Sequence, residues 1–255
     1  MGSNEILQRG LKCQSKMNLL YLWINILSIS VPMLVSFHPK VKLYRKWTAL
    51  WPAIMITLIP FVLWDIYFTH LGIWGFNPIY ISGQYILGLP IEEVMFFVCI
   101  PYACLYTYYC FKIYLPPHFQ IKHERRVTLI ILIILAIGLV TNGEKYYTGW
   151  TFIGLAICLI YLQYYLKPSW LGLFYYSHMF LVLPFLIVNG VLTGTGIENE
   201  VVWYNNMENM GIRILTIPVE DVFYGMLMLL MNVAIFETLM ARFKLPINYL
   251  QKGRP

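Results

Sequence analysis

Long apolar segments, separated by short polar linkers, are the feature that most constrains how this chain can fold. A spanning helix needs about 20 mostly apolar residues. Seven segments reach or approach that length, at residues 18–36, 48–68, 83–111, 127–142, 150–166, 171–192 and 212–240. Charged residues make up only 12% of the 255, about half the share of an ordinary soluble domain. The sequence therefore predicts an all-α integral membrane protein with about seven transmembrane helices, and it excludes a soluble nucleic-acid binder or a secreted disulfide scaffold.

The distribution of Lys and Arg predicts how the chain is oriented. With seven spans, the tails and linkers fall into two sets, and these hold 5 and 13 of the 18 basic residues. Cytoplasmic segments carry the excess of positive charge. We therefore expect a multi-pass protein of the cell membrane, with the N-terminus outside and residues 241–255 as a cytoplasmic tail. Residues 1–16 are expected to form a polar tail that lacks the features of a signal peptide, and Met17 is an alternative start.

An internal repeat divides the chain into two halves. The sequence LPIEEV at residues 89–94 recurs 128 positions later as IPVEDV, and PFVLWD at 60–65 is echoed by PFLIVN at 184–189. The pattern predicts one three-helix repeat over residues 17–111 and a second over 150–240. The linker 112–149 carries a spacer helix, which restores the orientation of the second copy. The two repeats would then run parallel, in a 3+1+3 arrangement known from some transporters.

The two acidic motifs are the strongest candidates for chemistry. An ionisable residue within an apolar span is unfavourable, and it indicates a functional site by default. Pro90 and Pro218 precede the motifs and mark either a helix start or a kink. Asp65 and Asn189, at equivalent positions of the repeats, are expected to hydrogen-bond to the acids. Stabilisation of a helix N-terminus is the alternative role. The four candidate acids are Glu92, Glu93, Glu220 and Asp221.

Neighbouring acids in each motif should differ in role. Consecutive residues on a helix point about 100° apart, so both cannot face one site. Repulsion between adjacent carboxylates and their poor hydration favour one shared proton per pair. We expect one acid of each pair to line a cavity, while its neighbour supports it. The sequence has no Gly-rich dinucleotide fingerprint, no DxxxD pair and no metal-ligand spacing, so it predicts neither a cofactor nor a metal.

The motifs resemble those of the membrane-integral lycopene cyclases, in the form that carries both repeats on one chain. The resemblance covers about residues 17–240 and rests on both acidic motifs, on the pair Trp64-Asp65 and on the runs 37–40 (FHPK) and 72–78 (GIWGFNP). It implies redox-neutral cyclisation of the acyclic ends of lycopene, or of a related acyclic carotenoid, mostly to β-rings. It also implies a membrane-lipid setting and no role for nucleic acid. Whether one or both ends react, and whether γ- or ε-rings form, stays open.

The resemblance also implies catalytic roles for both motifs. We expect Glu92 and Glu220 to include the acid that protonates the substrate, with Glu93 and Asp221 supporting it or taking the final proton. Either motif is compatible with the protonating role. The expected supporting residues are Trp64, Asp65, Asn189, Pro90 and Pro218.

Two functions of other classes compete with this hypothesis. A membrane transporter also uses parallel repeats, but it would line its path with polar residues, whereas Leu, Ile, Phe and Tyr dominate these spans. A non-catalytic carotenoid-binding membrane protein needs no paired carboxyl groups. The sequence does not indicate an oligomeric state.

Overall fold

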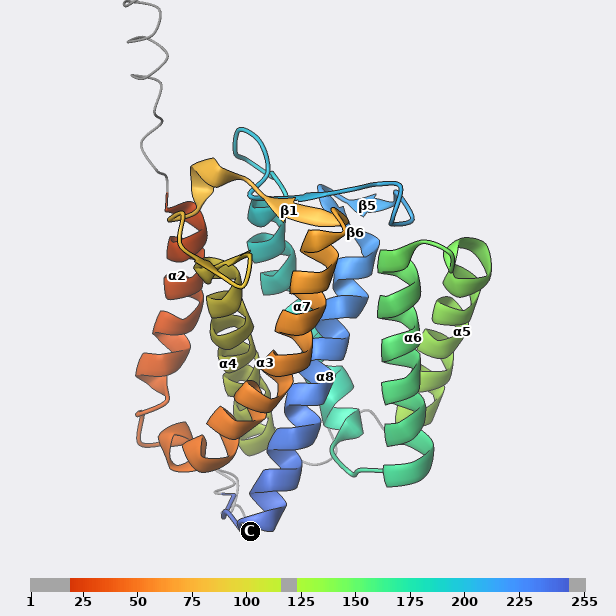
Figure 1. Ribbon diagram of the computed structural model, residues 1–255. Coiled ribbons are helices and arrows are strands. Elements are labelled where there is room, and N and C mark those ends of the chain that lie inside the picture. The colour runs from red at the N-terminus through yellow and green to blue at the C-terminus, as the bar shows by residue number, and fades with distance from the viewer. Residues whose placement is uncertain (1–18, 116–122, 248–255) are drawn as a thin grey trace, which may run out of the picture.

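Helices dominate the computed structural model, which describes residues 19–115 and 123–247 (Figure 1). The polar tail expected at 1–16 lies outside these residues. The α-helices are α2 (Leu20–Val35), α3 (Trp47–His70), α4 (Ile91–Tyr114), α5 (Glu124–Asn142), α6 (Tyr146–Ile160), α7 (Leu171–Leu192) and α8 (Val219–Arg242). A 3-10 turn, Leu43–Lys46, leads into α3, and a π-helical turn, Tyr161–Leu166, extends α6. Five helical segments in the described ranges are long and apolar enough to cross a membrane: 43–70, 91–114, 146–166, 171–192 and 219–242.

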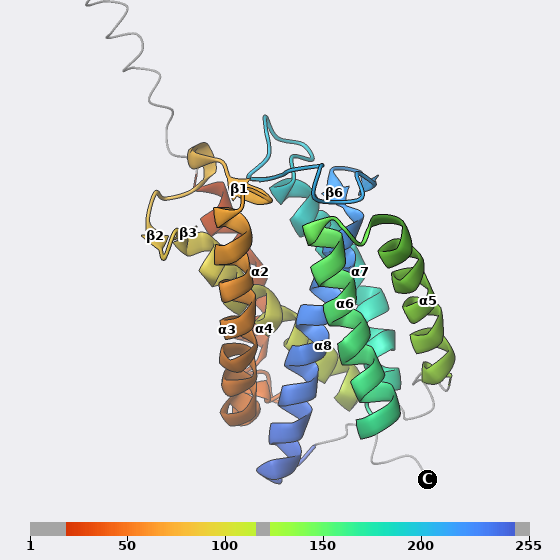
Figure 2. The ribbon, with the colours of Figure 1, turned by 45° about the vertical axis from the view of Figure 1, so that its right-hand side comes forward.

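Short strands correct the expectation of a purely helical chain. Three antiparallel pairs occur in the part of the chain that the structure describes. They are β1 (Trp74–Phe76) with β4 (Val202–Tyr204), β2 (Tyr85–Ile86) with β3 (Leu89–Pro90), and β5 (Arg213–Ile214) with β6 (Ile217–Pro218). A 3-10 turn, Pro78–Tyr80, follows β1. The strand pairs lie together at one end of the helix bundle (Figures 1 and 2).

Two predicted helices begin directly after a proline. For the segments 83–111 and 212–240 the sequence left open whether Pro90 and Pro218 mark a helix start or a kink, and the structure decides this, because α4 starts at Ile91 and α8 at Val219. The residues before them form the hairpins β2–β3 and β5–β6. Pro90 and Pro218 are the last residues before each helix, where the missing N–H of proline removes no helical hydrogen bond. Both prolines therefore mark helix starts, and the acids lie in the first turn. The other helix limits agree with the prediction to within four residues, when the π-helical turn Tyr161–Leu166 is counted with α6.

The two halves pack in equivalent ways around α4 and α8. Helix α2 lies against α4 as α6 lies against α8, and α4 contacts α7 as α8 contacts α3. The third helix of each half thus packs on the second helix of the other half. Helix α5 lies at the edge of the bundle, against α6 (Figure 2). The core between the helices is apolar and includes Leu50, Tyr102, Leu155, Phe174 and Leu230.

The strand pair β1–β4 joins the two halves at the end of the bundle. Its central partners, Gly75 and Trp203, lie 128 positions apart, so equivalent residues of the two halves face each other. The Trp203 ring covers Gly75 so closely that a Cβ atom at Gly75 would lie 2.4 Å from it. Only glycine therefore fits at position 75 beneath this ring. Packing of an aromatic ring over a glycine also stabilises the glycine in a sheet.

A larger residue at Gly75 should weaken this connection. Gly75→Val forces the Trp203 ring away, and we expect about 1–3 kcal/mol of destabilisation, as for other overpacked sites. Thermal unfolding in detergent, followed by circular dichroism, measures the effect. In a Trp203→Ala background the same substitution should be better tolerated, because the clash is gone. Strictly additive effects of the two substitutions would contradict this explanation.

Candidate active site

Glu92 and Glu220 hold the hairpins that precede their own helices. Oε1 of Glu92 accepts a hydrogen bond from the backbone N–H of Ser82 at 2.7 Å, and Oε1 of Glu220 accepts one from Met210 at 2.7 Å. The donors lie ten residues before the acids in both repeats, so the two contacts are equivalent. Glu220 Oε1 also accepts a bond from the Thr148 hydroxyl at 2.6 Å. Both side chains are fully buried, and neither lines the cavity described below.

Glu93 points the other way, into a cavity between the helices. Its Oε2 accepts a hydrogen bond from the hydroxyl of Tyr21 in α2. The carboxyl group of Asp65, from α3, lies within side-chain hydrogen-bonding range of Glu93. All three residues are buried and line the cavity. Asp65 thus contacts an acid of the first motif, which the sequence predicted.

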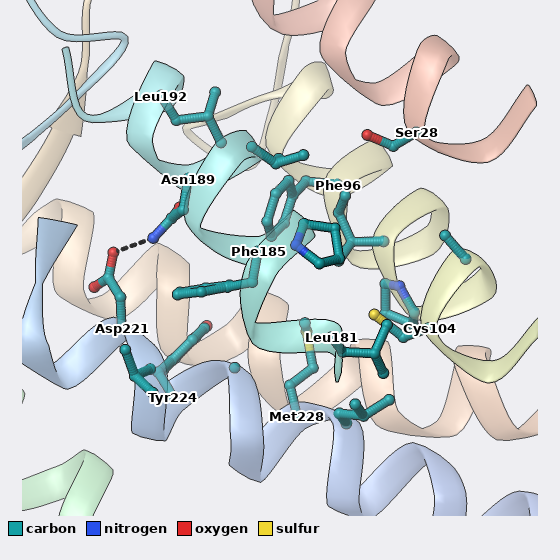
Figure 3. A pocket seen from close by; sticks show the side chains of 18 of the residues that line it. Ser28, Phe96, Cys104, Leu181, Phe185, Asn189, Leu192, Asp221, Tyr224 and Met228 are labelled. Atoms are coloured by element: carbon teal, nitrogen blue, oxygen red, sulfur yellow. Dashed lines mark hydrogen bonds between the residues drawn. The ribbon is translucent and has the colours of Figure 1, made fainter. Parts of the chain in front are cut away.

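Asp221 is the equivalent of Glu93 in the second half, and it accepts three hydrogen bonds. Its Oδ1 is bonded by the Tyr147 hydroxyl, and its Oδ2 by Asn189 Nδ2 at 2.6 Å and by the Tyr204 hydroxyl at 3.0 Å. Figure 3 shows the contact between Asn189 and Asp221 at one side of the cavity. Burial, together with the nearby Asp221 carboxyl, raises the pKa of the Tyr204 phenol well above its usual range. Tyr204 therefore stays protonated and acts as a donor.

The cavity has a volume of about 340 Å³ and mostly apolar walls. The carboxyl groups of Glu93, Asp221 and Asp65 share it, although they come from three different helices. Figure 3 shows the Asp221 side chain on one side of the cavity and the side chains of Ser28 and Cys104 on the other. Its volume falls within the range of small-molecule sites, which combine apolar walls with a few polar groups. Apolar lining residues include Phe96, Ile100, Leu181, Phe185, Val188 and Met228.

Aromatic rings surround the carboxyl groups. Tyr224 lines the cavity, and its buried hydroxyl has no hydrogen-bond partner among the described residues. Trp64, expected to support the site, does not line the cavity but packs behind Tyr224, with ring centroids 5.2 Å apart. Trp74 and Phe76 also line the cavity. Faces of such rings can stabilise a positive charge that develops beside them.

Sequence reasoning missed the tyrosine donors Tyr21, Tyr147 and Tyr204. Tyr21 and Tyr147 occupy equivalent positions, 126 residues apart, in the first helix of each half. Aligning those helices of the repeat would have brought out this shared tyrosine. Tyr204 has no tyrosine counterpart, because the residue 128 positions earlier is Phe76, so only the structure identifies it.

A further buried carboxyl group, that of Glu237, lies away from the cavity. Glu237 of α8 forms an ion pair with Lys112 of α4 and accepts a hydrogen bond from the Tyr108 hydroxyl at 2.6 Å. This contact joins α4 to α8 outside the candidate site. Within residues 19–115 and 123–247, no three His, Cys, Asp or Glu side chains come together as a metal site would require.

Comparison with known proteins shows to which family the chain belongs. The sequence model described as lycopene cyclase matches residues 18–111 and 144–239, in two segments that correspond to the two halves. The chain belongs to the lycopene cyclase family. A bifunctional lycopene cyclase/phytoene synthase of Aspergillus niger is 34% identical over 92 residues, which make up 35% of this chain and 16% of that protein. No solved structure matches the chain. Membership links the chain to carotenoid biosynthesis.

The role of Glu220 in holding its hairpin can be tested through Thr148. Thr148→Val keeps the shape of the side chain but removes the hydroxyl that donates to Glu220. We expect about 1–3 kcal/mol of destabilisation, because a buried carboxyl group loses a partner. Thermal unfolding in detergent measures the loss. The matched control is Thr238→Val, which removes an exposed hydroxyl bonded only within its own helix. Equal effects of the two substitutions would contradict the assignment.

Proposed function

We propose that this chain is a lycopene cyclase that converts the acyclic ends of lycopene, or of a related carotenoid, to β-rings. The observation that carries the proposal is the meeting of acids from both repeats, Glu93 and Asp221, in one apolar-walled cavity. Membership of the family supports the substrate class. The reaction is an isomerisation, so its electrons balance without an external oxidant or reductant.

The chemistry requires an acid that water does not reach. Protonation of C2 of the end group leaves a tertiary cation at C1, and the 5,6 double bond attacks it to form the C1–C6 bond. Loss of the proton on C6 then gives the β-ring. An alkene is a very weak base, so the donor must be a poorly hydrated carboxyl group that keeps its proton. Buried carboxyl groups and aromatic rings around one cavity suit this requirement, since they exclude water and stabilise a cation.

Within each motif, we assign contact with the substrate to the second acid. Glu92 and Glu220 were expected to include the protonating acid, but their contacts with the hairpins favour a positioning role. Glu93 and Asp221 line the cavity, which favours them as the catalytic pair. Asp65 and Asn189 support these two through direct contacts.

Substitution of neighbouring acids separates the two roles. In a bacterial host that accumulates lycopene, the wild-type chain should produce cyclised carotenoid. Glu93→Gln should lower its yield at least about 100-fold, which is the lower range for loss of a general acid. Glu92→Gln should retain most of the yield, because the glutamine oxygen still accepts the Ser82 N–H. Chromatography of the pigments measures the products, and immunoblotting of membranes controls for protein level. Inactive Glu92→Gln at a wild-type protein level would reverse the assignment, and lycopene alone from the wild-type chain would refute the function.

We also propose a multi-pass protein with two parallel repeats, 17–111 and 150–240, and a spacer helix between them. The two family matches and the equivalent contacts of Glu92 and Glu220 support this division. At the end of the bundle that carries the strand pairs, the described basic residues are Lys145 and Arg213. The described turns and helix ends at the opposite end carry the remaining basic residues of these ranges, among them Lys40, Lys42, Arg125, Arg126 and Lys244. This asymmetry supports a cytoplasmic C-terminus and an N-terminus outside.

Reporter fusions test this orientation. A fluorescent protein that matures only in the cytoplasm should fluoresce when it is fused to the C-terminus. Alkaline phosphatase, which is active only outside the cytoplasm, should be inactive at the same position. Active phosphatase together with absent fluorescence would show the opposite orientation.

A further inference from the structure

The two halves of the cavity differ at the residues that contact its acids. Tyr21 and Tyr147 make equivalent bonds to Glu93 and Asp221. The next partner differs, since Asp65 in the first half corresponds to Asn189, 124 positions later, in the second. The two halves therefore share the tyrosine donor but differ in the second residue that contacts the acid.

Around Asp221, every hydrogen-bond partner among residues 19–115 and 123–247 is a donor. The amide nitrogen of Asn189 can only donate, and the raised pKa of Tyr204 keeps its hydroxyl protonated. Together with Tyr147, they offer three hydrogens to the two oxygens of one carboxyl group. A carboxylate accepts all three, whereas a protonated carboxyl would have to place its own hydrogen among them. This surrounding favours a charged, proton-accepting Asp221.

Around Glu93, Tyr21 is again a donor, but the other partners differ. Asp65 supplies a carboxyl group where Asn189 supplies an amide, and Phe76 stands where Tyr204 supplies a hydroxyl. Two carboxyl groups hydrogen-bond to each other only when one of them carries a proton. Two buried carboxyl groups that line the same apolar-walled cavity repel each other when both are charged, which favours a shared proton on the pair Asp65–Glu93, and fewer donors compete for its oxygens.

We infer that the Asp65–Glu93 pair donates the proton that starts cyclisation, and that Asp221 is the base that ends it. The inference rests on the proposed cyclase function and names the motif that does each step. The proton of the pair forms the new C2–H bond with the electrons of the 1,2 double bond. The electrons of the 5,6 double bond form the C1–C6 bond. Asp221 then removes the proton from C6, and the electrons of that C–H bond become the ring double bond.

The base also determines the type of ring. Loss of the C6 proton gives a β-ring, whereas loss from C4 gives an ε-ring and loss from the methyl group on C5 gives a γ-ring. A carboxylate that three hydrogen bonds hold in place has one fixed position relative to the cation. Asp221 is thus the residue expected to select the β-ring, while Asp65 and Glu93 affect how fast any ring forms.

Hydrogen isotopes distinguish the two steps. Membranes that contain each variant are incubated in heavy water with unlabelled lycopene, and deuterium at C2 is measured in products and in recovered lycopene. Asp65→Asn reproduces the amide of the second half, and it should lower deuterium incorporation at least about 100-fold. Asp221→Asn should still incorporate deuterium. Part of it should appear in recovered lycopene, because protonation at C2 is reversed, and part in the ring products, of which a larger share should be ε- or γ-rings. Asp65→Glu and Asp221→Glu keep the carboxyl groups, and both should retain at least about a tenth of wild-type β-ring formation.

The outcomes separate this inference from the function on which it rests. Wild-type incorporation by Asp65→Asn, or none by Asp221→Asn when both proteins reach wild-type levels in the membrane, overturns the assignment of donor and base. If an asparagine variant fails to accumulate, the matching glutamate variant decides, since a total loss of rings there at normal protein level also overturns it. Wild-type membranes that leave lycopene unchanged would instead refute the cyclase function.

Discussion

Carboxyl groups buried among apolar helices must find hydrogen-bond donors, and this requirement organises the whole strand-bearing end of the bundle. Glu92 and Glu220 use the backbone N–H groups of Ser82 and Met210, which fixes both hairpins against their helices. A buried polar group without partners would cost several kcal/mol, so the chain folds back to supply them. The same contacts leave Pro90 and Pro218 at the helix starts. The next residue of each helix then faces inward, toward the cavity.

The cavity depends on both halves of the chain. Glu93 is contacted from α2 and α3, and Asp221 from α6, α7 and β4. Helices α4 and α8 carry the acids, and each packs on a helix of the other half. Neither half alone would enclose the site, because part of each wall comes from the other. The pair β1–β4 closes the same end, with Gly75 under the Trp203 ring at its centre.

Duplication has produced two similar surroundings with different chemical properties. Asp65 in the first half corresponds to Asn189 in the second. A carboxyl group can carry and release a proton, whereas an amide donates hydrogen bonds through its nitrogen and accepts them through its oxygen without releasing a proton. Tyr204 in place of Phe76 adds a further donor on one side. The backbone stays equivalent, whereas the two acids acquire opposite tendencies to hold a proton. A reaction that begins with proton donation and ends with proton removal needs such a pair.

The sequence by itself determined the helical segments and the repeated motifs, because the length of apolar segments and the spacing of motifs can be read without the fold. It also indicated the four acids as candidates, with Asp65 and Asn189 as residues that contact them. It left the starts of α4 and α8 open, because Pro90 and Pro218 are compatible with either a helix start or a kink. Only the tertiary structure decided that Glu93 and Asp221, rather than Glu92 and Glu220, line the cavity. It also brought in Tyr204. The physical reason is that the rotation of a helix about its axis, and the partners it meets from distant segments, are fixed by packing between helices and not by local spacing.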